Sequence, residues 1–131
     1  MAHNRMIYIF YGALLTLGML SYWFLALTFG APGIAVLATV VILSDIGGYI
    51  VGRLIGGAKF WPTISPKKTW SGTVAGWLLA GLFGLYLIQQ IGALWPVPVA
   101  MLVAFSAQMG DIAESWVKRR QGVKDSSQLI P

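Results

Sequence analysis

The chain has 131 residues, of which 57% are hydrophobic and only 10% are charged, and its mean hydropathy is +0.75. A water-soluble domain of this length could not bury so much apolar surface in one core, so the composition excludes a soluble globular protein and indicates an integral membrane protein. Because the net charge of +5 comes without a soluble basic face, it favours anionic lipid headgroups and phosphorylated substrates as partners over nucleic acid.

Four apolar segments are long enough to cross a bilayer, since about 20 apolar residues in a helix span its hydrocarbon core. In chain order we expect these spans over residues 7–29, 34–51, 73–95 and 99–116. Short turns at residues 30–33 and 95–98 would join the outer pairs, and a basic, proline-containing loop over residues 53–69 would join the middle two. The expected fold is an all-α, polytopic membrane helix bundle in a single transmembrane domain over residues 1–131.

The basic residues predict the orientation of this bundle. If the N-terminus is cytoplasmic, all nine Lys and Arg residues lie on the cytoplasmic side, and the two short turns on the other side contain none. This distribution obeys the positive-inside rule. We therefore expect an integral protein of the bacterial inner (cell) membrane with both termini, and its polar chemistry, on the cytoplasmic face.

Glycines recur every four residues at the end of the second span, at Gly48, Gly52 and Gly56. Such spacing is typical of helices that pack closely against each other. Gly52 and Gly57 also have the spacing of a phosphate-binding loop, but Ala58 stands where that loop requires lysine. Close helix packing is therefore the favoured interpretation.

The end of the fourth span concentrates the polar residues: residues 110–125 contain three of the four carboxylates and four of the nine basic residues. Asp111, Ser115 and Lys118 share one helix face, with Glu114 beside it. A carboxylate is costly near a membrane, and binding of a divalent cation such as Mg²⁺ would justify that cost. An intrahelical ion pair of Lys118 with Asp111 or Glu114 explains the spacing equally well.

Asp45 is a carboxylate inside the second span, two helical turns before Arg53. It could face a cytoplasmic cavity or make a buried polar contact between helices. We favour the functional interpretation, because ionisable groups within membrane spans usually mark functional sites.

A third polar cluster lies at residues 64–72. Here Ser65 is expected to cap a helix and Pro66 to be its first residue. Lys67 and Lys68 would then lie at a helix N-terminus, where free amides and the helix dipole favour phosphate. The alternative, slightly favoured by composition alone, is a pair of lysines that set topology and bind lipid headgroups.

Together these clusters resemble the phosphatidate cytidylyltransferase family, the CDP-diacylglycerol synthases. The family motif S-x-x-K-R-x-x-x-x-K-D and the G-D-x-x-E-S before it are matched by Gly110-Asp111, Glu114-Ser115, Lys118-Arg119 and Lys124-Asp125. Ser44-Asp45-Ile-Gly-Gly-Tyr49 is similar to the family's S-D-x-x-A-Y, and residues 64–70 match a third motif. The resemblance covers residues 44–131.

The resemblance implies transfer of CMP from CTP to phosphatidate, giving CDP-diacylglycerol and pyrophosphate in phospholipid biosynthesis. It implies that Asp111 binds Mg²⁺ and acts in catalysis together with Lys118 and Arg119. The substrate contacts that it implies are Asp45, Ser65, Lys67, Lys68, Thr69, Glu114, Ser115, Lys124 and Asp125. The implied partners are CTP, phosphatidate and anionic membrane lipid, without nucleic acid, and a homo-oligomer is compatible with the sequence.

Two features depart from the family pattern. Ser71 stands where the family usually has glutamate, and the chain stops at Pro131 without the family's H-G-G-x-x-D-R-x-D element. We therefore expect a truncated chain with a partial cytidylyltransferase domain. The alternative is a catalytically inactive, truncated membrane paralogue that binds anionic lipid or a membrane partner.

Overall fold

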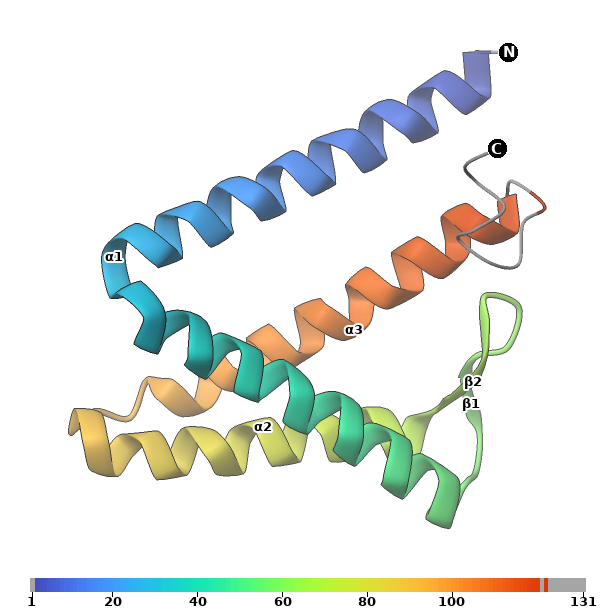
Figure 1. The fold of residues 1–131 in the computed structure, drawn as a ribbon. Helices are drawn as coiled ribbons and strands as arrows, with labels where there is room; N and C mark the ends of the chain where they lie inside the picture. The colour runs from blue at the N-terminus through green and yellow to red at the C-terminus, as the bar shows by residue number, and fades with distance from the viewer. Residues whose placement is uncertain (1, 121, 123–131) are drawn as a thin grey trace. The chain divides into compact units, whose positions relative to one another are not determined.

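The computed structural model describes residues 2–120 and residue 122. The elements follow in the order α1 (Ala2–Ile55), β1 (Lys59–Trp61), β2 (Ser65–Thr69), α2 (Trp70–Ile91) and α3 (Pro96–Arg120), as Figure 1 shows. All three helices are long and apolar enough to cross a membrane. The protein is therefore an integral membrane protein built on helices, as its composition predicted.

Helix α1 differs most from the expected fold. Two separate spans were expected on either side of a turn at residues 30–33, and the corresponding residues 2–55 form two helical stretches joined by a kink within α1. The backbone leaves helical geometry at Gly30 (φ 60°, ψ −156°), a conformation that glycine adopts without steric cost. Pro32, which lacks an amide hydrogen, follows inside the helix. The part of the chain that the structure describes therefore contains three helices, all long and apolar enough to cross a membrane, and the expected count of four spans stays a prediction.

The chain divides into two compact units between Ala38 and Thr39, so that α1 contributes residues to both. The elements β1, β2, α2 and α3 all belong to the second unit. The following description of packing and of the candidate site concerns the second unit alone.

The boundaries of α2 and α3 are set by their capping residues. Helix α2 ends at Ile91 because Gly92 takes a left-handed conformation (φ 72°) and donates its N–H to the Ile88 carbonyl at 2.7 Å. Helix α3 begins at Pro96, so Pro96 and Pro98 lie in its first turn, where a missing amide hydrogen costs nothing. The expected turn at residues 95–98 is therefore shifted toward the N-terminus, and both helices differ by a few residues from the predicted spans.

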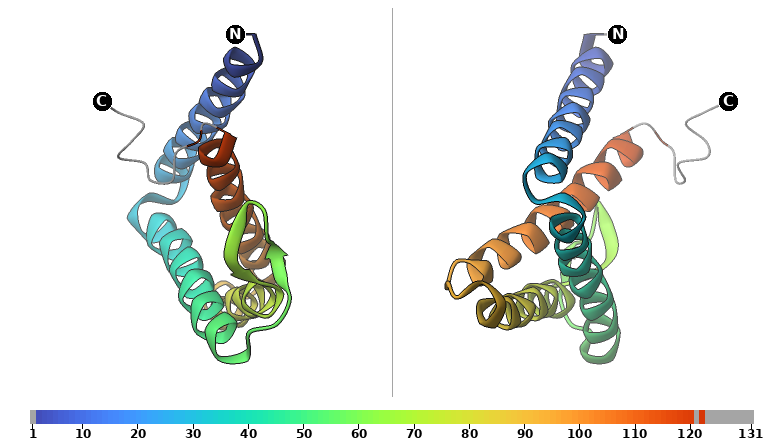
Figure 2. Two further views of the ribbon diagram at one scale, coloured as in Figure 1. Left: turned by 90° about the vertical axis from the view of Figure 1, so that its right-hand side faces the viewer. Right: turned by 60° about the vertical axis from the view of Figure 1, so that its left-hand side comes forward.

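The link before α2 forms an antiparallel β-hairpin, where only a loop was expected. Lys59 pairs with Thr69 and Trp61 with Ser65 in β1 and β2. The Ile64 N–H donates to the Trp61 carbonyl at 3.2 Å in the connecting turn. The two views of Figure 2 show this hairpin beside α3 and at the start of α2.

The helix cap predicted in this link was also misplaced. Ser65 and Pro66 lie in β2, where Ser65 pairs with Trp61 of β1. The cap of α2 is Thr69, whose Oγ1 accepts a hydrogen bond from the Gly72 N–H at 3.3 Å.

Small residues bring the second half of α1 against the start of α2. A Cβ on Gly48 would lie 3.0 Å from the Gly72 carbonyl oxygen, and one on Gly52 would lie 2.8 Å from Thr69 Oγ1. The predicted close packing at Gly48 and Gly52 is confirmed. Gly56 instead ends the helix with a positive φ of 65°.

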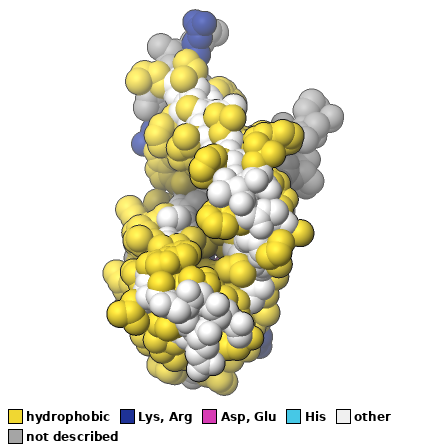
Figure 3. Space-filling view, turned by 90° about the vertical axis from the view of Figure 1, so that its left-hand side faces the viewer, with side chains coloured by type: hydrophobic (Ala, Val, Ile, Leu, Met, Phe, Trp, Pro, Cys, Tyr) yellow, Lys and Arg dark blue, Asp and Glu magenta, His cyan; other side chains and the backbone are white. Residues whose placement is uncertain are grey.

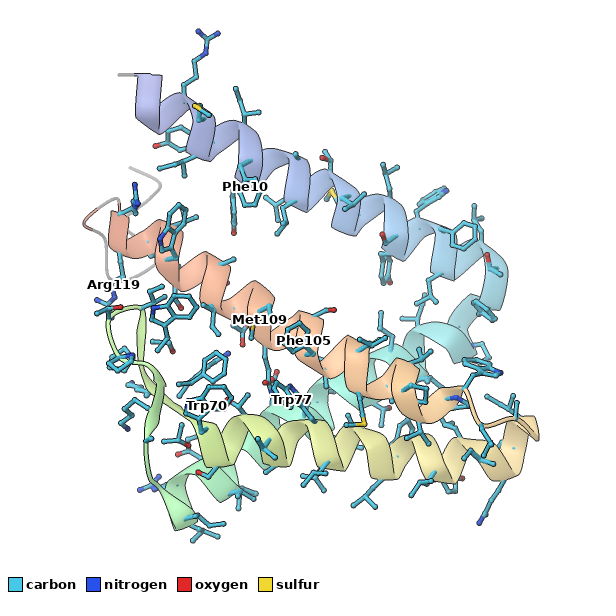
Figure 4. All side chains as sticks on the ribbon, turned by 180° about the vertical axis from the view of Figure 1, so that it is seen from behind. Phe10, Trp70, Trp77, Phe105, Met109 and Arg119 are labelled. Carbon is cyan, nitrogen blue, oxygen red and sulfur yellow. The ribbon has the colours of Figure 1, made fainter. Side chains whose placement is uncertain are left out.

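Small residues also join α2 to α3 near the turn between them. A Cβ on Gly84 would lie 2.7 Å from Val97 Cα, so the two backbones are nearly in contact there. Ala80, Ala100 and Ala104 continue this interface in the buried core. Farther from the turn the helices diverge (Figure 1), and Trp77 and Phe105 fill the space with ring centroids 5.6 Å apart (Figure 4).

The outer surface is apolar. On the face in Figure 3, hydrophobic side chains cover most of the area and Lys or Arg side chains are few. Large side chains such as Leu54, Leu82 and Leu102 are more than half exposed. Such a surface is suited to lipid rather than water.

Candidate active site

A cavity of about 790 Å³ opens among the second half of α1, the hairpin and the helices α2 and α3. Six charged side chains line it, four cationic and two anionic: Arg53, Lys59, Lys67, Lys68, Asp45 and Asp111. The uncharged part of the lining consists mainly of glycine and hydroxyl residues. The cavity therefore combines carboxylates with an excess of positive charge, a composition suited to a phosphorylated ligand.

An ion pair joins the hairpin to α3 within this cavity. Lys68 Nζ, on β2, lies 3.0 Å from Asp111 Oδ2 and donates a longer hydrogen bond, 3.4 Å, to the Gln108 carbonyl oxygen. The Lys68 side chain is 28% exposed and that of Asp111 is 55% exposed. Two residues that sequence motifs singled out separately are thus direct neighbours, and Asp111 pairs with Lys68 rather than with Lys118.

Asp45 supplies the second carboxylate. It lies on α1, lines the same cavity and is exposed to it. Asp111 and Lys68 line the cavity together with it. Asp45 is therefore exposed at the cavity and not buried between helices, and its functional role stays a prediction.

A buried polar cluster adjoins these charges. Gln108, Ser44 and Thr73 are at most 6% exposed, and Gln108 Nε2 donates to Ser44 Oγ at 3.2 Å and to the Thr73 carbonyl at 3.5 Å. Gly76 makes room for this amide, because a Cβ there would lie 2.6 Å from Gln108 Nε2. Gln108 thus connects α1, α2 and α3 one turn before Asp111.

Hydroxyl groups fix the junction between the hairpin and α2. Ser71 Oγ donates to the Gly56 carbonyl at 2.6 Å and lies 3.1 Å from Thr69 Oγ1. Thr73 Oγ1 donates to the Thr69 carbonyl at 2.9 Å. Thr69 lines the cavity, but its buried hydroxyl is engaged in capping α2. These bonds hold the backbone next to Lys68 in place.

Two cations of the cavity were not singled out as site residues from the sequence. Arg53 donates from Nη1 to the Tyr49 hydroxyl at 2.8 Å, and both side chains line the cavity. Lys59 lies on β1 and also lines it. The spacing of Arg53 one turn after Tyr49, itself in a motif with Asp45, was the signal that could have identified it.

Several predicted site residues do not line the cavity. Glu114 and Lys118 form an ion pair within α3, which is the intrahelical alternative weighed for this pair. Ser65, Ser115 and Arg119 are likewise absent from the cavity lining in the described part of the chain. Figure 4 shows Arg119 at the end of α3 nearest the hairpin.

Two further predicted contacts, Lys124 and Asp125, lie outside the described residues. Their relation to the cavity remains a prediction.

The carboxylates of the cavity fit a shared divalent-metal site. Within residues 2–120 and 122, no three or more His, Cys, Asp or Glu side chains cluster into a metal cage. Magnesium usually takes only one or two protein carboxylates and completes its shell with substrate phosphates and water. Asp45 and Asp111 provide two such carboxylates, and both are accessible from the cavity.

Comparison with known proteins decides the family. The model of the "Cytidylyltransferase family" matches residues 1–131. The chain belongs to this family. One curated relative is the phosphatidate cytidylyltransferase of Brucella suis biovar 1, which is 46% identical to this chain over 106 residues. The aligned residues are 79% of this chain and 39% of the relative.

Relatives from other bacteria agree with this assignment. The phosphatidate cytidylyltransferase of Staphylococcus saprophyticus is 41% identical over 96 residues, covering 70% of this chain and 37% of the relative. That of Helicobacter pylori is 38% identical over 106 residues, covering 79% and 40%. The aligned part of the chain thus spans about two fifths of the length of these relatives. No solved structure matches it significantly.

Proposed function

We propose that this chain provides the site at which CMP is transferred from CTP to phosphatidate, giving CDP-diacylglycerol and pyrophosphate. The observation that carries the proposal is the Lys68–Asp111 pair, in a cavity that also contains Asp45 and three more cations. The relatives named phosphatidate cytidylyltransferase provide the choice of substrates.

The reaction needs charge neutralisation more than proton transfer. A phosphate oxygen of phosphatidate attacks the α-phosphorus of CTP, the bond from that phosphorus to the β-phosphate oxygen breaks, and pyrophosphate leaves. Because a phosphate monoester is anionic near neutral pH, the nucleophile requires no general base. Holding the two phosphates in line and neutralising the developing charge are then the main tasks of the protein.

The cavity residues divide these tasks between them. We assign Lys67, Lys68 and Arg53 to the triphosphate, whose charge their cationic groups offset. Asp45 and Asp111 would hold Mg²⁺, which when bound supplies Lewis-acid neutralisation of the phosphate oxygens. Thr69 acts indirectly, since its cap fixes the start of α2 beside Lys68.

The predicted residues outside the cavity lining retain a separate proposed role. We assign Lys118 and Arg119 to the phosphate and headgroup region of the lipid substrate, because both lie in the last turn of α3. Glu114 would orient Lys118 through their ion pair. The remaining predicted contacts, for which the family motifs are the support, are Ser65, Ser115, Lys124 and Asp125.

We also propose that the site faces the cytoplasm of a bacterial inner membrane. Helix α1 has 54 residues, so it would be about 80 Å long if straight, whereas the hydrocarbon core is about 30 Å thick. Two crossings with a turn near Gly30 accommodate this length, and the distribution of Lys and Arg supports cytoplasmic termini.

A direct assay tests the proposed reaction. Membranes that contain the chain should convert labelled CTP and phosphatidate into CDP-diacylglycerol when Mg²⁺ is added. Replacing Asp111 with Asn should lower the rate about 100-fold or more, because a metal contact contributes several kcal/mol to transition-state stabilisation. Glu114→Gln is the matched carboxylate control on the same helix, and its loss should be at least tenfold smaller.

The same assay distinguishes the proposed enzyme from the catalytically inactive alternative. If the chain binds a CTP analogue but forms no more product than Asp111→Asn, it acts as a binding protein, and the catalytic proposal is wrong for this chain.

A further inference from the structure

Lys68 occupies the position in the cavity that suits a bound metal cation. Its ammonium group contacts a carboxylate oxygen of Asp111 and the backbone carbonyl oxygen of Gln108, and Asp45 lines the same cavity. Carboxylate and backbone carbonyl oxygens are the ligands that hard divalent cations prefer. The ammonium group therefore contacts the oxygen atoms that would coordinate a metal ion.

The ion pair between Lys68 and Asp111 can break readily, so that each group can take another partner. Both side chains are partly exposed, and ion pairs in contact with solvent are weak because water screens them. The lysine side chain is a flexible four-carbon stem, whereas the backbone beside it is held by the Thr69 cap and the β1–β2 pairing. The ammonium can therefore leave Asp111 without movement of the hairpin.

We propose that Lys68 neutralises the carboxylates while nucleotide is absent, and that it moves from Asp111 to a phosphate when metal and nucleotide bind together. This inference rests on the proposed assignment of the cavity to CTP and Mg²⁺. It follows from charge balance: a divalent cation next to Asp45, Asp111 and an unmoved Lys68 would be opposed by the ammonium. A triphosphate provides the ammonium with a new anionic partner.

The consequence is an order of binding. Metal alone binds weakly because it must displace Lys68 without offering the ammonium another anion. The metal–nucleotide complex binds as one unit, since it supplies both the cation for the carboxylates and the anion for Lys68. Lys68 thereby weakens the binding of metal to Asp111 before nucleotide arrives.

Binding of Mn²⁺ without nucleotide tests this role directly. The chain, in nanodiscs of zwitterionic lipid, is titrated with Mn²⁺ alone and the free ion is measured by electron paramagnetic resonance. Lys68→Gln should bind Mn²⁺ about fivefold more tightly than the wild type, the upper range for a solvent-exposed ion pair. Lys68→Arg, which keeps the charge, should bind Mn²⁺ as weakly as the wild type.

Lys67→Gln is the matched control. Lys67 directly precedes Lys68 in β2 and lines the same cavity, but it has no ion pair among the described residues. It removes the same charge, yet should change the affinity for Mn²⁺ less than about twofold. An equal gain in both variants would show a general charge effect and overturn the proposal. So would an unchanged or weaker affinity in Lys68→Gln.

Two additional arms complete the test. With a non-hydrolysable CTP analogue present, Lys68→Gln should bind the Mn²⁺–analogue complex more weakly than the wild type does. This change in affinity is the opposite of the one expected for Mn²⁺ alone. Asp111→Asn should abolish the gain in the Lys68→Gln background, and a retained gain would overturn the proposal. If these signs hold but no CDP-diacylglycerol forms, the proposed reaction fails while the role of Lys68 stands.

Discussion

Gln108 shows how one buried amide can hold a site together. Its Nε2 contacts groups on α1 and α2, while its backbone carbonyl oxygen accepts from Lys68 on β2. Four elements thus meet at a residue that carries no charge. Because Ser44 is fully buried, removing the Gln108 side chain takes away the donor that its hydroxyl contacts.

Gln108→Ala should therefore destabilise the folded chain by about 2–4 kcal/mol, from the cavity and the lost hydrogen bonds. Thermal unfolding in detergent measures the effect. Gln89→Ala, at an exposed position of α2, is the control and should change the stability by less than about 0.5 kcal/mol. Equal melting temperatures for the two variants would show that the amide has no structural role.

The two groups of cations should differ in which substrate they serve. Lys67→Ala should raise KM for CTP about tenfold and leave KM for phosphatidate nearly unchanged, since Lys67 lines the cavity. Arg119→Ala should do the reverse, because Arg119 lies at the end of α3 outside the cavity lining. Steady-state kinetics with each substrate varied in turn decide this, and the same KM change for both variants would refute the division.

At the residue scale, the sequence showed which charged residues stand in unusual places, but it could not show which residues contact one another. Asp45, Lys68 and Asp111 were identified because charge is rare in this chain and lies within motifs. The contact of Gln108 with Ser44 joins residues 64 positions apart, and no local pattern encodes such a distance. Arg53 and Lys59 were attributed to topology alone, although both line the cavity.

At the element scale, glycine positions set how closely the helices approach. A Cβ on Gly72 would overlap the Gly48 carbonyl oxygen and lie 3.1 Å from Gly52 Cα, both of them backbone atoms that cannot rotate away. Gly72→Ala should therefore lower the stability by about 1–3 kcal/mol through overpacking. Thermal unfolding with a parallel count of folded protein by gel filtration measures this loss.

Gly110→Ala is the matched control for that prediction. Gly110 lies inside α3, and a Cβ there would meet no described atom within 4 Å. Alanine has a higher helix propensity than glycine, so this variant should be neutral or more stable by up to about 1 kcal/mol. A loss at Gly110 equal to that at Gly72 would contradict the packing argument.

The β-hairpin could not be predicted from local sequence patterns. Its strands have three and five residues, too few for a recognisable alternation of apolar and polar side chains. Ser65 and Pro66 have the residue types of a helix start, but strand pairing with Trp61 extends the chain to Thr69 before α2 begins. Tertiary pairing thus overrode a local capping signal.

At the scale of the whole molecule, the proposed topology makes a prediction about exposure. The chain contains no cysteine, so single cysteines can be introduced as unique labels. Thr63→Cys, in the hairpin turn, should react with an impermeant thiol reagent only from the cytoplasmic side. Leu94→Cys, in the α2–α3 turn, should react only from the opposite side, because α2 is long enough to span the membrane between them. Labelling of both from one side would refute the orientation.

Whole-molecule features were predictable where composition alone decides them. Apolar length identified the membrane helices, since a span needs about 20 residues whatever its neighbours are. Apolar length alone does not fix how the helices are divided. The turn signals at Gly30 and Pro32 indicate a break, but whether the backbone forms a loop or a kink depends on a single pair of dihedral angles.

The tight junction of α2 and α3 has one more consequence. At Gly84 the backbones almost touch, and from there the helices diverge toward the end that holds the cavity. The junction therefore acts as a pivot, and the part of α2 from Gly84 back to Trp70 forms an arm of about 20 Å. A side chain added at the pivot would change the separation of the tips by more than its own size. We therefore expect a substitution at Gly84 to change the spacing between the hairpin and Asp111, although Gly84 itself does not line the cavity.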